Sequence, residues 1–235
     1  MPTVNIERLR KLDYRCNEAY KTLRTNIQLC GADMKVLMFT SSTPNEGKSS
    51  VSFNLAVSLA ESGKKVIFID ADLRKSVLVG RYKINRAIKG LTQFLSGMNK
   101  FDEVICATNV ENLYVVFSGL VPPNPSELLA NSSFTALIKA LRDTYDYVII
   151  DTPPLGSVTD ASIVAQRCDG SVLVVAANMV SYKFIQTSLE QLRKTQCKIL
   201  GTVLNKVDMS GDGYYGKYYG SYYGKYYGKY GKNEK

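Results

Sequence analysis

The chain has 235 residues, of which 45% are hydrophobic, and its 30 lysines and arginines outnumber 21 acidic residues, giving a formal net charge of +9. It contains no histidine, which excludes Ser-His-Asp chemistry. Because no apolar run is long enough, we expect neither a membrane-spanning segment nor a signal peptide. Five scattered cysteines without a CxxC pair predict buried structural thiols in a reducing compartment, and the basic balance suits a nucleotide, nucleic acid or anionic membrane.

Residues 5–30 are predicted to form a charged helix ahead of the first core strand. Within it Glu18, Lys21 and Arg24 are three residues apart and therefore share one helical face. This spacing is typical of a solvated face with a weak intrahelical ion pair. A face that carries both signs of charge could also dock on a second copy of the chain.

The stretch that organises the chain is 36–50. An apolar run at 36–39 predicts a buried strand, Gly47-Lys48-Ser49-Ser50 follows a short loop, and a helical pattern occupies 49–62. This order is what a phosphate-binding P-loop requires, with Lys48 reaching the β- and γ-phosphates and the Ser49 hydroxyl holding Mg²⁺. Ser42 stands where the first glycine of the motif belongs, so an ordinary turn between strand and helix remains the alternative.

A second apolar strand at 66–69 ends in Asp70-Ala71-Asp72-Leu73-Arg74. At the carboxyl end of a parallel strand both acids would face the ligand crevice, and two acids beside a phosphate site require Mg²⁺. Arg74 is expected to contact phosphate or to pair with either acid. The alternative is a capped strand end with a salt bridge.

The rest of the chain up to residue 208 alternates between strands and helices. A strand at 147–150 ends at Asp151, which is typical of a Walker B carboxylate that holds Mg²⁺ directly or through water. Asp160 is predicted to be an N-cap, and Ser126 to be the N-cap of the helix that follows a rigid proline-rich connector. Further strands are predicted at 113–117, 171–176 and 199–204, and helices at 91–95, 134–142 and 182–194. The alternation predicts an α/β fold of the P-loop NTPase type, with a mostly parallel sheet and helices on both faces.

Beyond residue 209, where we expect the domain 1–209 to end, the composition changes to a YYG[KS] repeat. With no Val, Ile, Leu or Phe to bury, residues 210–235 are predicted to be a disordered tail. Mobile tyrosines attached to an ATP site would place a substrate beside a kinase, whereas a sticky low-complexity tail without chemistry is the alternative. The tyrosines concerned are Tyr214, Tyr215, Tyr218, Tyr219, Tyr222, Tyr223, Tyr226, Tyr227 and Tyr230.

With these motifs the chain resembles the bacterial tyrosine kinases (BY-kinases), of the cytoplasmic type encoded in capsular and exopolysaccharide loci of Gram-positive bacteria. The resemblance rests on STPNEGKS at 42–49, FIDADLR at 68–74, VIIDTPP at 148–154 and the tyrosine cluster. The first three motifs are shared with the Min/Par-type ATPases, and the tyrosine tail makes the resemblance specific.

The resemblance implies an enzyme that uses ATP and Mg²⁺ to phosphorylate tyrosines. In it Lys48 binds phosphates, Ser49, Asp72 and Asp151 hold Mg²⁺, and Asp70 orients or deprotonates the attacking tyrosine. The implied nucleotide-binding set is Asn45, Glu46, Gly47, Lys48, Ser49, Ser50 and Asn205, the last of which would read the adenine edge.

The resemblance also implies partners. In the family an E-x-x-R-x-x-R helix assembles a ring, for which an octamer is one size, so that each tail is phosphorylated by a neighbour; here Lys21 replaces the first arginine. A transmembrane polysaccharide co-polymerase would act as the adaptor that completes the ATP site, and a phosphotyrosine phosphatase would reverse the reaction. The chain would then lie at the inner face of the membrane, regulate capsular or exopolysaccharide synthesis and export, and bind no nucleic acid.

Three other functions remain open. A Min/Par-type positioning ATPase would share the three motifs, although the second lysine of its loop and a C-terminal amphipathic helix are missing from the pattern. A GTPase is indicated by the match of residues 205–208 to N-K-x-D, which leaves the two acids at 70 and 72 and the tail unexplained. A scaffold with an adhesive tail would need no chemistry.

Overall fold

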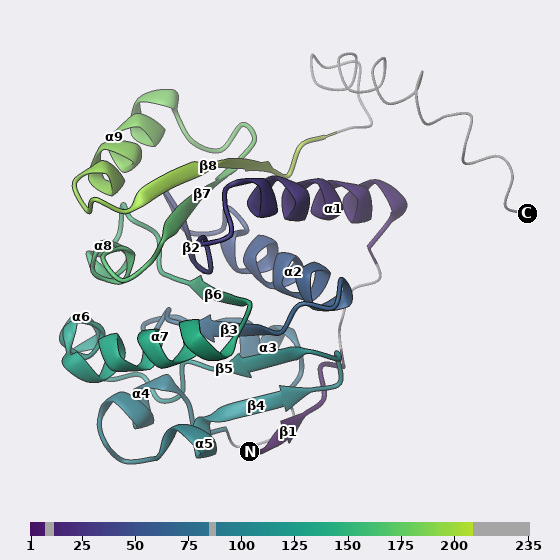
Figure 1. Ribbon diagram of the computed structural model, residues 1–235. Coiled ribbons are helices and arrows are strands. Elements are labelled where there is room, and N and C mark those ends of the chain that lie inside the picture. The colour runs from purple at the N-terminus through teal and green to yellow at the C-terminus, as the bar shows by residue number, and fades with distance from the viewer. Residues whose placement is uncertain (8–11, 85–87, 209–235) are drawn as a thin grey trace, which may run out of the picture.

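The computed structural model describes residues 1–7, 12–84 and 88–208 of the chain (Figure 1). This part forms an eight-stranded sheet of order β1-β4-β5-β3-β6-β2-β7-β8, in which β4 and β5 are antiparallel and the other neighbours are parallel. The predicted mostly parallel α/β fold is therefore confirmed. The strands are β1 (Thr3–Val4), β2 (Val36–Ser41), β3 (Val66–Asp70), β4 (Ile105–Thr108), β5 (Leu113–Val116), β6 (Tyr147–Asp151), β7 (Gly170–Ala176) and β8 (Lys198–Asn205).

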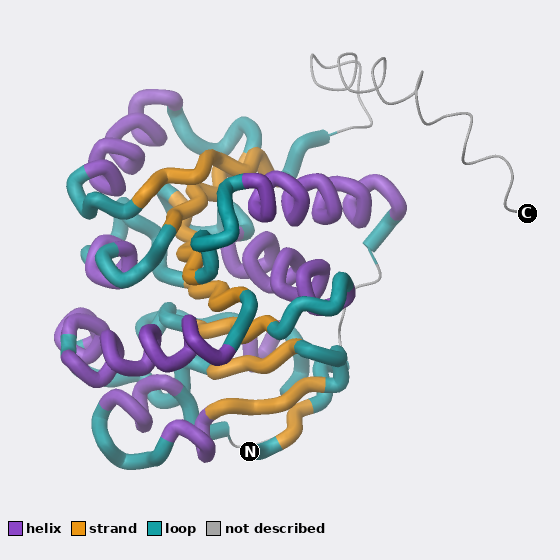
Figure 2. Tube along the Cα trace, in the orientation of Figure 1, coloured by secondary structure: helices purple, strands orange, loops and turns teal. Residues whose placement is uncertain are grey.

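Helices cover both faces of the sheet (Figures 1 and 2). One face carries α2, which α1 covers in turn, and the other face carries α4 and α6 to α9. The helices are α1 (Tyr14–Leu29), α2 (Lys48–Glu61), α3 (Leu78–Arg81), α4 (Leu91–Leu95), α5 (Phe101–Val104), α6 (Pro125–Ala130), α7 (Ser132–Thr144), α8 (Asp160–Ala165) and α9 (Tyr182–Arg193).

Strand alternation divides the hydrophobic core into two layers. In β2, Val36 and Met38 pack with α7 and its neighbours, whereas Leu37 and Phe39 pack against α2. Every residue of β2, β3 and β7 is buried, as expected for parallel strands with helices on both sides. Because α2 lies between the sheet and α1, eleven of its residues are buried, among them the polar Lys48 and Ser49 at its start.

The N-terminal region differs from the prediction of one helix over 5–30. Thr3 and Val4 form a short strand parallel to β4, and α1 begins only at Tyr14, where the Asp13 side chain accepts a hydrogen bond of 2.7 Å from the Cys16 amide. The predicted helix started too early because an apolar stripe does not show where a helix begins. The capping residue Asp13 does show it.

Two other predictions were wrong. Helix α6 begins at Pro125 with Asn124 at the N-cap, because proline is well suited to the first turn of a helix, so Ser126 is not a cap. The thiols are not uniformly buried: Cys106 and Cys197 are buried, but Cys16 is exposed. The strand β4 and the helices α3 and α5, each four residues long, were not predicted.

Across the described ranges no helix is long and apolar enough to cross a membrane. The predicted end of the domain at 209 and the nine tyrosines of the tail lie outside the described residues.

Candidate active site

Three loops meet where the adjacent strands β2, β6 and β3 end. Asp151, the last residue of β6, lies in register with Phe39 on one side and with Asp70 on the other. Since these strands are parallel, the loops that follow them emerge at one edge of the sheet. The fold therefore brings together the P-loop and the acids at 70, 72 and 151, as the sequence predicts.

The P-loop after β2 has the backbone conformation that its sequence allows. Asn45 and Gly47 have positive φ angles of 67° and 93°, a region open to asparagine and glycine. A Cβ atom on Gly47 would lie 2.1 Å from the Asn205 side-chain nitrogen, so no larger residue fits there. Helix α2 starts at the next residue, Lys48, so its N-terminus, the end of a helix that favours phosphate, lies at the end of the loop.

The loop is braced from β7 and β8. The fully buried Glu46 carboxylate accepts hydrogen bonds from the Thr43 amide at 2.6 Å and the Ala176 amide at 3.0 Å. The Asn205 side chain donates to the Glu46 carbonyl at 2.9 Å, and Lys206 Nζ to the Asn45 carbonyl at 2.6 Å. Both Glu46 and Asn205, predicted as nucleotide-binding residues, thus have side chains that hold the loop in shape.

Ser42 explains how the loop tolerates the loss of its first glycine. It has no positive φ, so a side chain is accommodated, and it is fully buried with a hydroxyl that has no partner. The close approach occurs on the facing loop, where the Gly156 amide donates to the Ser42 carbonyl at 3.1 Å. A Cβ on Gly156 would lie 2.6 Å from that carbonyl oxygen, so the glycine required here follows β6.

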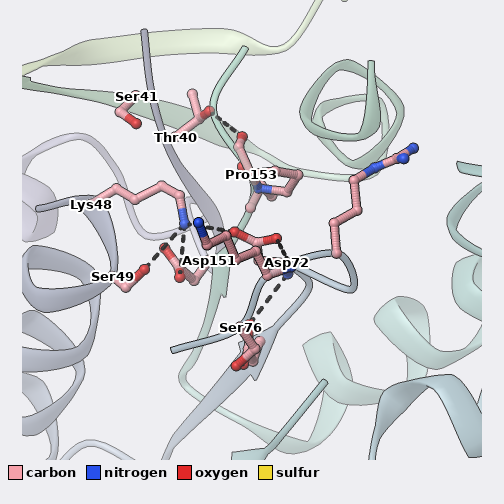
Figure 3. A network of polar contacts seen from close by, with 12 residues as sticks. Thr40, Ser41, Lys48, Ser49, Asp72, Ser76, Asp151 and Pro153 are labelled. Atoms are coloured by element: carbon pink, nitrogen blue, oxygen red, sulfur yellow. Dashed lines mark hydrogen bonds and ion pairs between the residues drawn. The ribbon is translucent and has the colours of Figure 1, made fainter. Parts of the chain in front are cut away.

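Lys48 lies between two carboxylates (Figure 3). Its Nζ is 3.3 Å from Asp72 Oδ2, 3.3 Å from Asp151 Oδ2 and 3.1 Å from Ser49 Oγ. Asp151 also accepts a bond of 3.3 Å from Ser52, which follows Lys48 by four residues and so lies on the same face of α2. The sequence reading missed Ser52, although this spacing points to it.

Burial and crowding set the charges of the site. Burial raises the pKa of Asp70 to about 7, helped by the charge of Asp151 and opposed by the Ser76 hydrogen bond and by Lys48. Burial also raises the pKa of Asp151, against the influence of Lys48. Burial alone would lower the pKa of Lys48, but the charges of Asp151, Asp72 and Asp70 raise it. Three acids thus share one lysine, which leaves the site short of positive charge.

The loop after β3 turns its polar groups inward. Asp70 Oδ1 accepts from the Asp72 amide at 3.3 Å, and Oδ2 accepts a bond from the Ser76 hydroxyl. Asp72 Oδ1 accepts from the Lys75 amide at 3.1 Å. Ser76 was not singled out in the sequence, because a serine six residues after the strand has no recognisable pattern.

Arg74 and Asp160 form a pair with each other that the sequence did not predict. Arg74 pairs with neither acid of its own loop but donates twice to Asp160, from Nε at 2.8 Å and from a terminal nitrogen at 3.0 Å. Asp160 is the first residue of α8 rather than its cap, has no exposed surface, and accepts a further bond of 2.6 Å from Ser126. This bidentate pair holds the loop after β3 against α6 and α8.

The predicted association residues do not act as one set within the chain. Lys21 forms an exposed ion pair of 2.7 Å with Glu18, whereas Arg24 donates at 2.7 Å to the Ser58 carbonyl in the last turn of α2. Ser50, predicted to bind nucleotide, accepts a bond of 2.7 Å from Arg81.

The residues at this edge fit a magnesium nucleotide. Among the described residues no group of three His, Cys, Asp or Glu side chains could hold a metal by itself. Asp72, Asp151 and Ser49 nevertheless supply two carboxylates and a hydroxyl around Lys48. Mg²⁺ in phosphotransfer sites is usually held in this way, by one or two carboxylates together with substrate phosphates and water.

Comparison with known proteins identifies the family. A family model described as an AAA domain matches residues 34–204. The chain is 46% identical over 216 residues to the tyrosine-protein kinase CpsD of Streptococcus pneumoniae serotype 4, covering 91% of this chain and 95% of that protein. The solved kinase domain of the Escherichia coli tyrosine kinase ETK matches with a TM-score of 0.80 and 35% identity, covering 84% of this chain and 78% of that one. The chain belongs to the bacterial tyrosine kinases.

The tyrosine kinases share their fold with Min-type proteins, as the common motifs predict. The septum site-determining protein MinD of Pyrococcus horikoshii, solved with Mg-ADP, matches with a TM-score of 0.62 and 27% identity over 75% of this chain and 72% of that one. The stronger match to CpsD and ETK identifies the enzyme class as a protein-tyrosine kinase with a P-loop nucleotide-binding fold. The predictions of a GTPase and of an inert scaffold are set aside.

Proposed function

We propose that this bacterial tyrosine kinase transfers the γ-phosphoryl group of Mg-ATP to tyrosines 214–230 in the tail of a second copy of the chain. The observation that carries the proposal is the position of Lys48, at the start of α2 and 3.3 Å from both Asp72 and Asp151. A lysine that neutralises two acids without a ligand is placed to bind phosphate when one arrives.

The proposal assigns a role to each residue of the site. Lys48 and the backbone N–H groups at the start of α2 bind the phosphates, and Ser49, Asp72 and Asp151 hold Mg²⁺ together with water. The metal would neutralise charge on the phosphates as the bond to the leaving ADP breaks. Glu46, Asn45, Gly47, Ser50 and Asn205 form or brace the nucleotide-binding loop, with Asn205 also reading the adenine edge.

Asp70 is the group proposed to receive the acceptor. It is 1% exposed, lies beside Asp151 in the sheet, and its two oxygens accept hydrogen bonds from the Asp72 amide and the Ser76 hydroxyl rather than from Lys48. It would accept the hydrogen bond of the tyrosine and, late in the reaction, its proton. Positioning and charge neutralisation would supply most of the rate, as in other phosphoryl transfers.

Chain length alone permits transfer within one chain or between chains. The described chain ends just after β8, four strands away from β3. At about 4.8 Å between neighbouring strands, the distance across the sheet from β8 to β3 is about 19 Å. Six extended residues, from Asp208 to Tyr214, reach about 20 Å. Assembly into a ring through Glu18, Lys21 and Arg24 favours transfer between neighbours, and remains part of the proposal.

The cellular setting is proposed from the family. The kinase would lie at the inner face of the cell membrane, bound to a transmembrane polysaccharide co-polymerase that activates it. A phosphotyrosine phosphatase would remove the phosphates, and the cycle would regulate capsular or exopolysaccharide synthesis and export. No nucleic-acid partner is proposed.

Mass spectrometry tests the proposal. The purified chain is incubated with Mg-ATP, with and without the cytoplasmic end of its co-polymerase, and residues 210–235 are examined for phosphotyrosine. We expect phosphate on several tail tyrosines. A Lys48→Met chain that carries the tail should be labelled by an active chain truncated after residue 209. ATP hydrolysis with every tail tyrosine unmodified would overturn the proposal in favour of a positioning ATPase.

A further inference from the structure

The Asp70 carboxylate already has a hydroxyl group bound to it. Ser76 donates a hydrogen bond to Asp70 Oδ2, and among the described residues no other side-chain hydroxyl bonds this acid. A hydroxyl on this carboxylate is the arrangement that the acceptor tyrosine needs in the proposed reaction. Ser76 is half-buried, whereas Asp70 is 1% exposed.

The orientation of the Ser76 hydroxyl is fixed by its surroundings. Its oxygen accepts a hydrogen bond of 3.4 Å from the Leu78 amide, so its proton is directed at Asp70. Leu78 is 1% exposed and anchors the start of α3 in the core. On the other side the loop is held by the bidentate bonds between Arg74 and Asp160. The loop therefore presents Ser76 to Asp70 from a fixed position.

We propose that Ser76 is a positioning residue that reserves Asp70 for tyrosine and keeps water away from it. This rests on the proposed function, in which Asp70 receives the acceptor. The phenol of a bound tyrosine displaces the serine hydroxyl, because the aromatic ring and the flanking peptide are held at the same time by other contacts. A water molecule has no such contacts and does not displace it.

The side reaction that Ser76 suppresses is hydrolysis. In that reaction the water oxygen would form a bond to the γ-phosphorus while the bond from the γ-phosphorus to the β–γ bridging oxygen breaks. ADP leaves with that oxygen and its electron pair, inorganic phosphate forms, and one proton of the water passes to Asp70. In tyrosine transfer the phenol oxygen takes the place of the water. Ser76 therefore lowers the share of ATP that is lost to hydrolysis and raises the ratio of transfer to hydrolysis.

The test compares Ser76→Ala with Ser76→Thr in the full chain. With Mg-ATP, the phosphate released and the phosphotyrosine formed in the tail are measured in the same sample. We expect Ser76→Ala to raise the ratio of released phosphate to phosphotyrosine about fivefold, the effect of one hydrogen bond. Ser76→Thr keeps the hydroxyl and should keep the wild-type ratio. Ser62→Ala is the matched control, because Ser62 lies beyond the far end of α2 and bonds only locally to the Leu59 carbonyl.

A second measurement needs no nucleotide. Thermal unfolding of the nucleotide-free chain should occur at lower temperature in Ser76→Ala than in Ser76→Thr, because only the alanine variant loses the bond to Asp70. An unchanged ratio in Ser76→Ala, or an equal fall in released phosphate and phosphotyrosine, would overturn the inference. If the wild-type chain hydrolyses ATP without labelling the tail, the proposed function fails instead, so the two failures are distinct.

Discussion

The two edges of the sheet treat their acidic side chains in opposite ways. At the amino edge, Asp169 accepts hydrogen bonds from the Lys35 and Val36 amides at 3.0 and 2.8 Å and pairs with Arg142. Asp146 accepts from the Lys65 amide at 2.8 Å. At the carboxyl edge, Asp70, Asp72 and Asp151 crowd around the single ammonium group of Lys48.

This difference is the one expected between acids that stabilise the fold and acids that bind a ligand, as we propose for the carboxyl edge. Backbone amides and arginines at the amino edge complete the bonding of their carboxylates within the chain. The carboxyl edge has more negative charge than the chain itself neutralises, and burial raises the pKa of Asp70 and Asp151. Unfavourable burial of like charges is tolerated in proteins where function requires it.

The largest effect should follow from removing the positive charge at the carboxyl edge. Lys48→Met removes the counter-charge of two buried acids and the proposed contact to phosphate, so we expect tail phosphorylation to fall by at least about a hundredfold. Phosphotyrosine formation and ATP affinity measure the effect. Arg142→Met, which removes the corresponding partner at the amino edge, should leave both within about twofold of wild type. Similar losses in both variants would contradict the comparison.

The second effect concerns stability and pH. The folded pKa of Asp70 is about 7, above the ordinary value of 3.8, so the folded chain holds a proton that the unfolded chain releases. The free energy of unfolding should therefore fall as the pH rises from about 4 to about 7. Asn cannot titrate, so Asp70→Asn should remove the contribution of Asp70 to this fall in the free energy of unfolding. The nucleotide-free variant should therefore be more stable than wild type at pH 8, by a few kcal/mol at most.

Urea unfolding at pH 5 and pH 8 checks this expectation. The difference between Asp70→Asn and wild type should be larger at pH 8. A variant that is equally destabilised at both pH values would show that Asp70 stabilises the fold.

The same substitution at the amino edge should have the opposite sign. Asp169→Asn weakens the bonds to two amides and to Arg142, so we expect the free energy of unfolding at pH 8 to fall by about 1–3 kcal/mol. Tail phosphorylation at a temperature well below unfolding should be unchanged. A more stable Asp169→Asn chain would remove the distinction between the two edges.

The smallest effects should come from the predicted association residues, which lie away from both sets of acids. Arg24→Ala removes a bond to the last turn of α2 and should lower the free energy of unfolding by about 1 kcal/mol. Lys21→Ala removes only an exposed pair, which is worth roughly 0.3–0.5 kcal/mol. Chemical unfolding measures both, and sedimentation of the same variants tests their proposed role in assembly. Equal destabilisation by both variants would show that the Arg24 contact contributes nothing specific.

The arrangement of the carboxyl edge could be predicted because each of its elements has a local sequence signal. Apolar runs mark β2, β3 and β6, and each is followed directly by the residues of the site, so parallel pairing alone brings Lys48, Asp70 and Asp151 together. The same local signals located α4 at residues 91–95.

What the sequence did not reveal depends on contacts between distant segments. The pairing of Arg74 with Asp160 spans 86 residues, and the hydrogen bond that the Ala176 amide donates to Glu46 spans 130. Neither leaves a periodic pattern, so Arg74 was expected beside its sequence neighbours and Glu46 beside the nucleotide. Asp160 was expected to cap a helix, since an acid at a helix start normally does so.

On the proposed function, the position of Lys48 between Asp72 and Asp151 would also determine the order in which the nucleotide and the metal bind. A lone divalent cation would have to compete with a tethered ammonium group for the same two carboxylates, and the nearby positive charge would repel it. On the proposed function, a triphosphate would instead draw the lysine away from both acids and leave them free to bind the metal. We therefore expect magnesium to bind as a complex with the nucleotide. The nucleotide-free enzyme should then be insensitive to changes in the concentration of free magnesium.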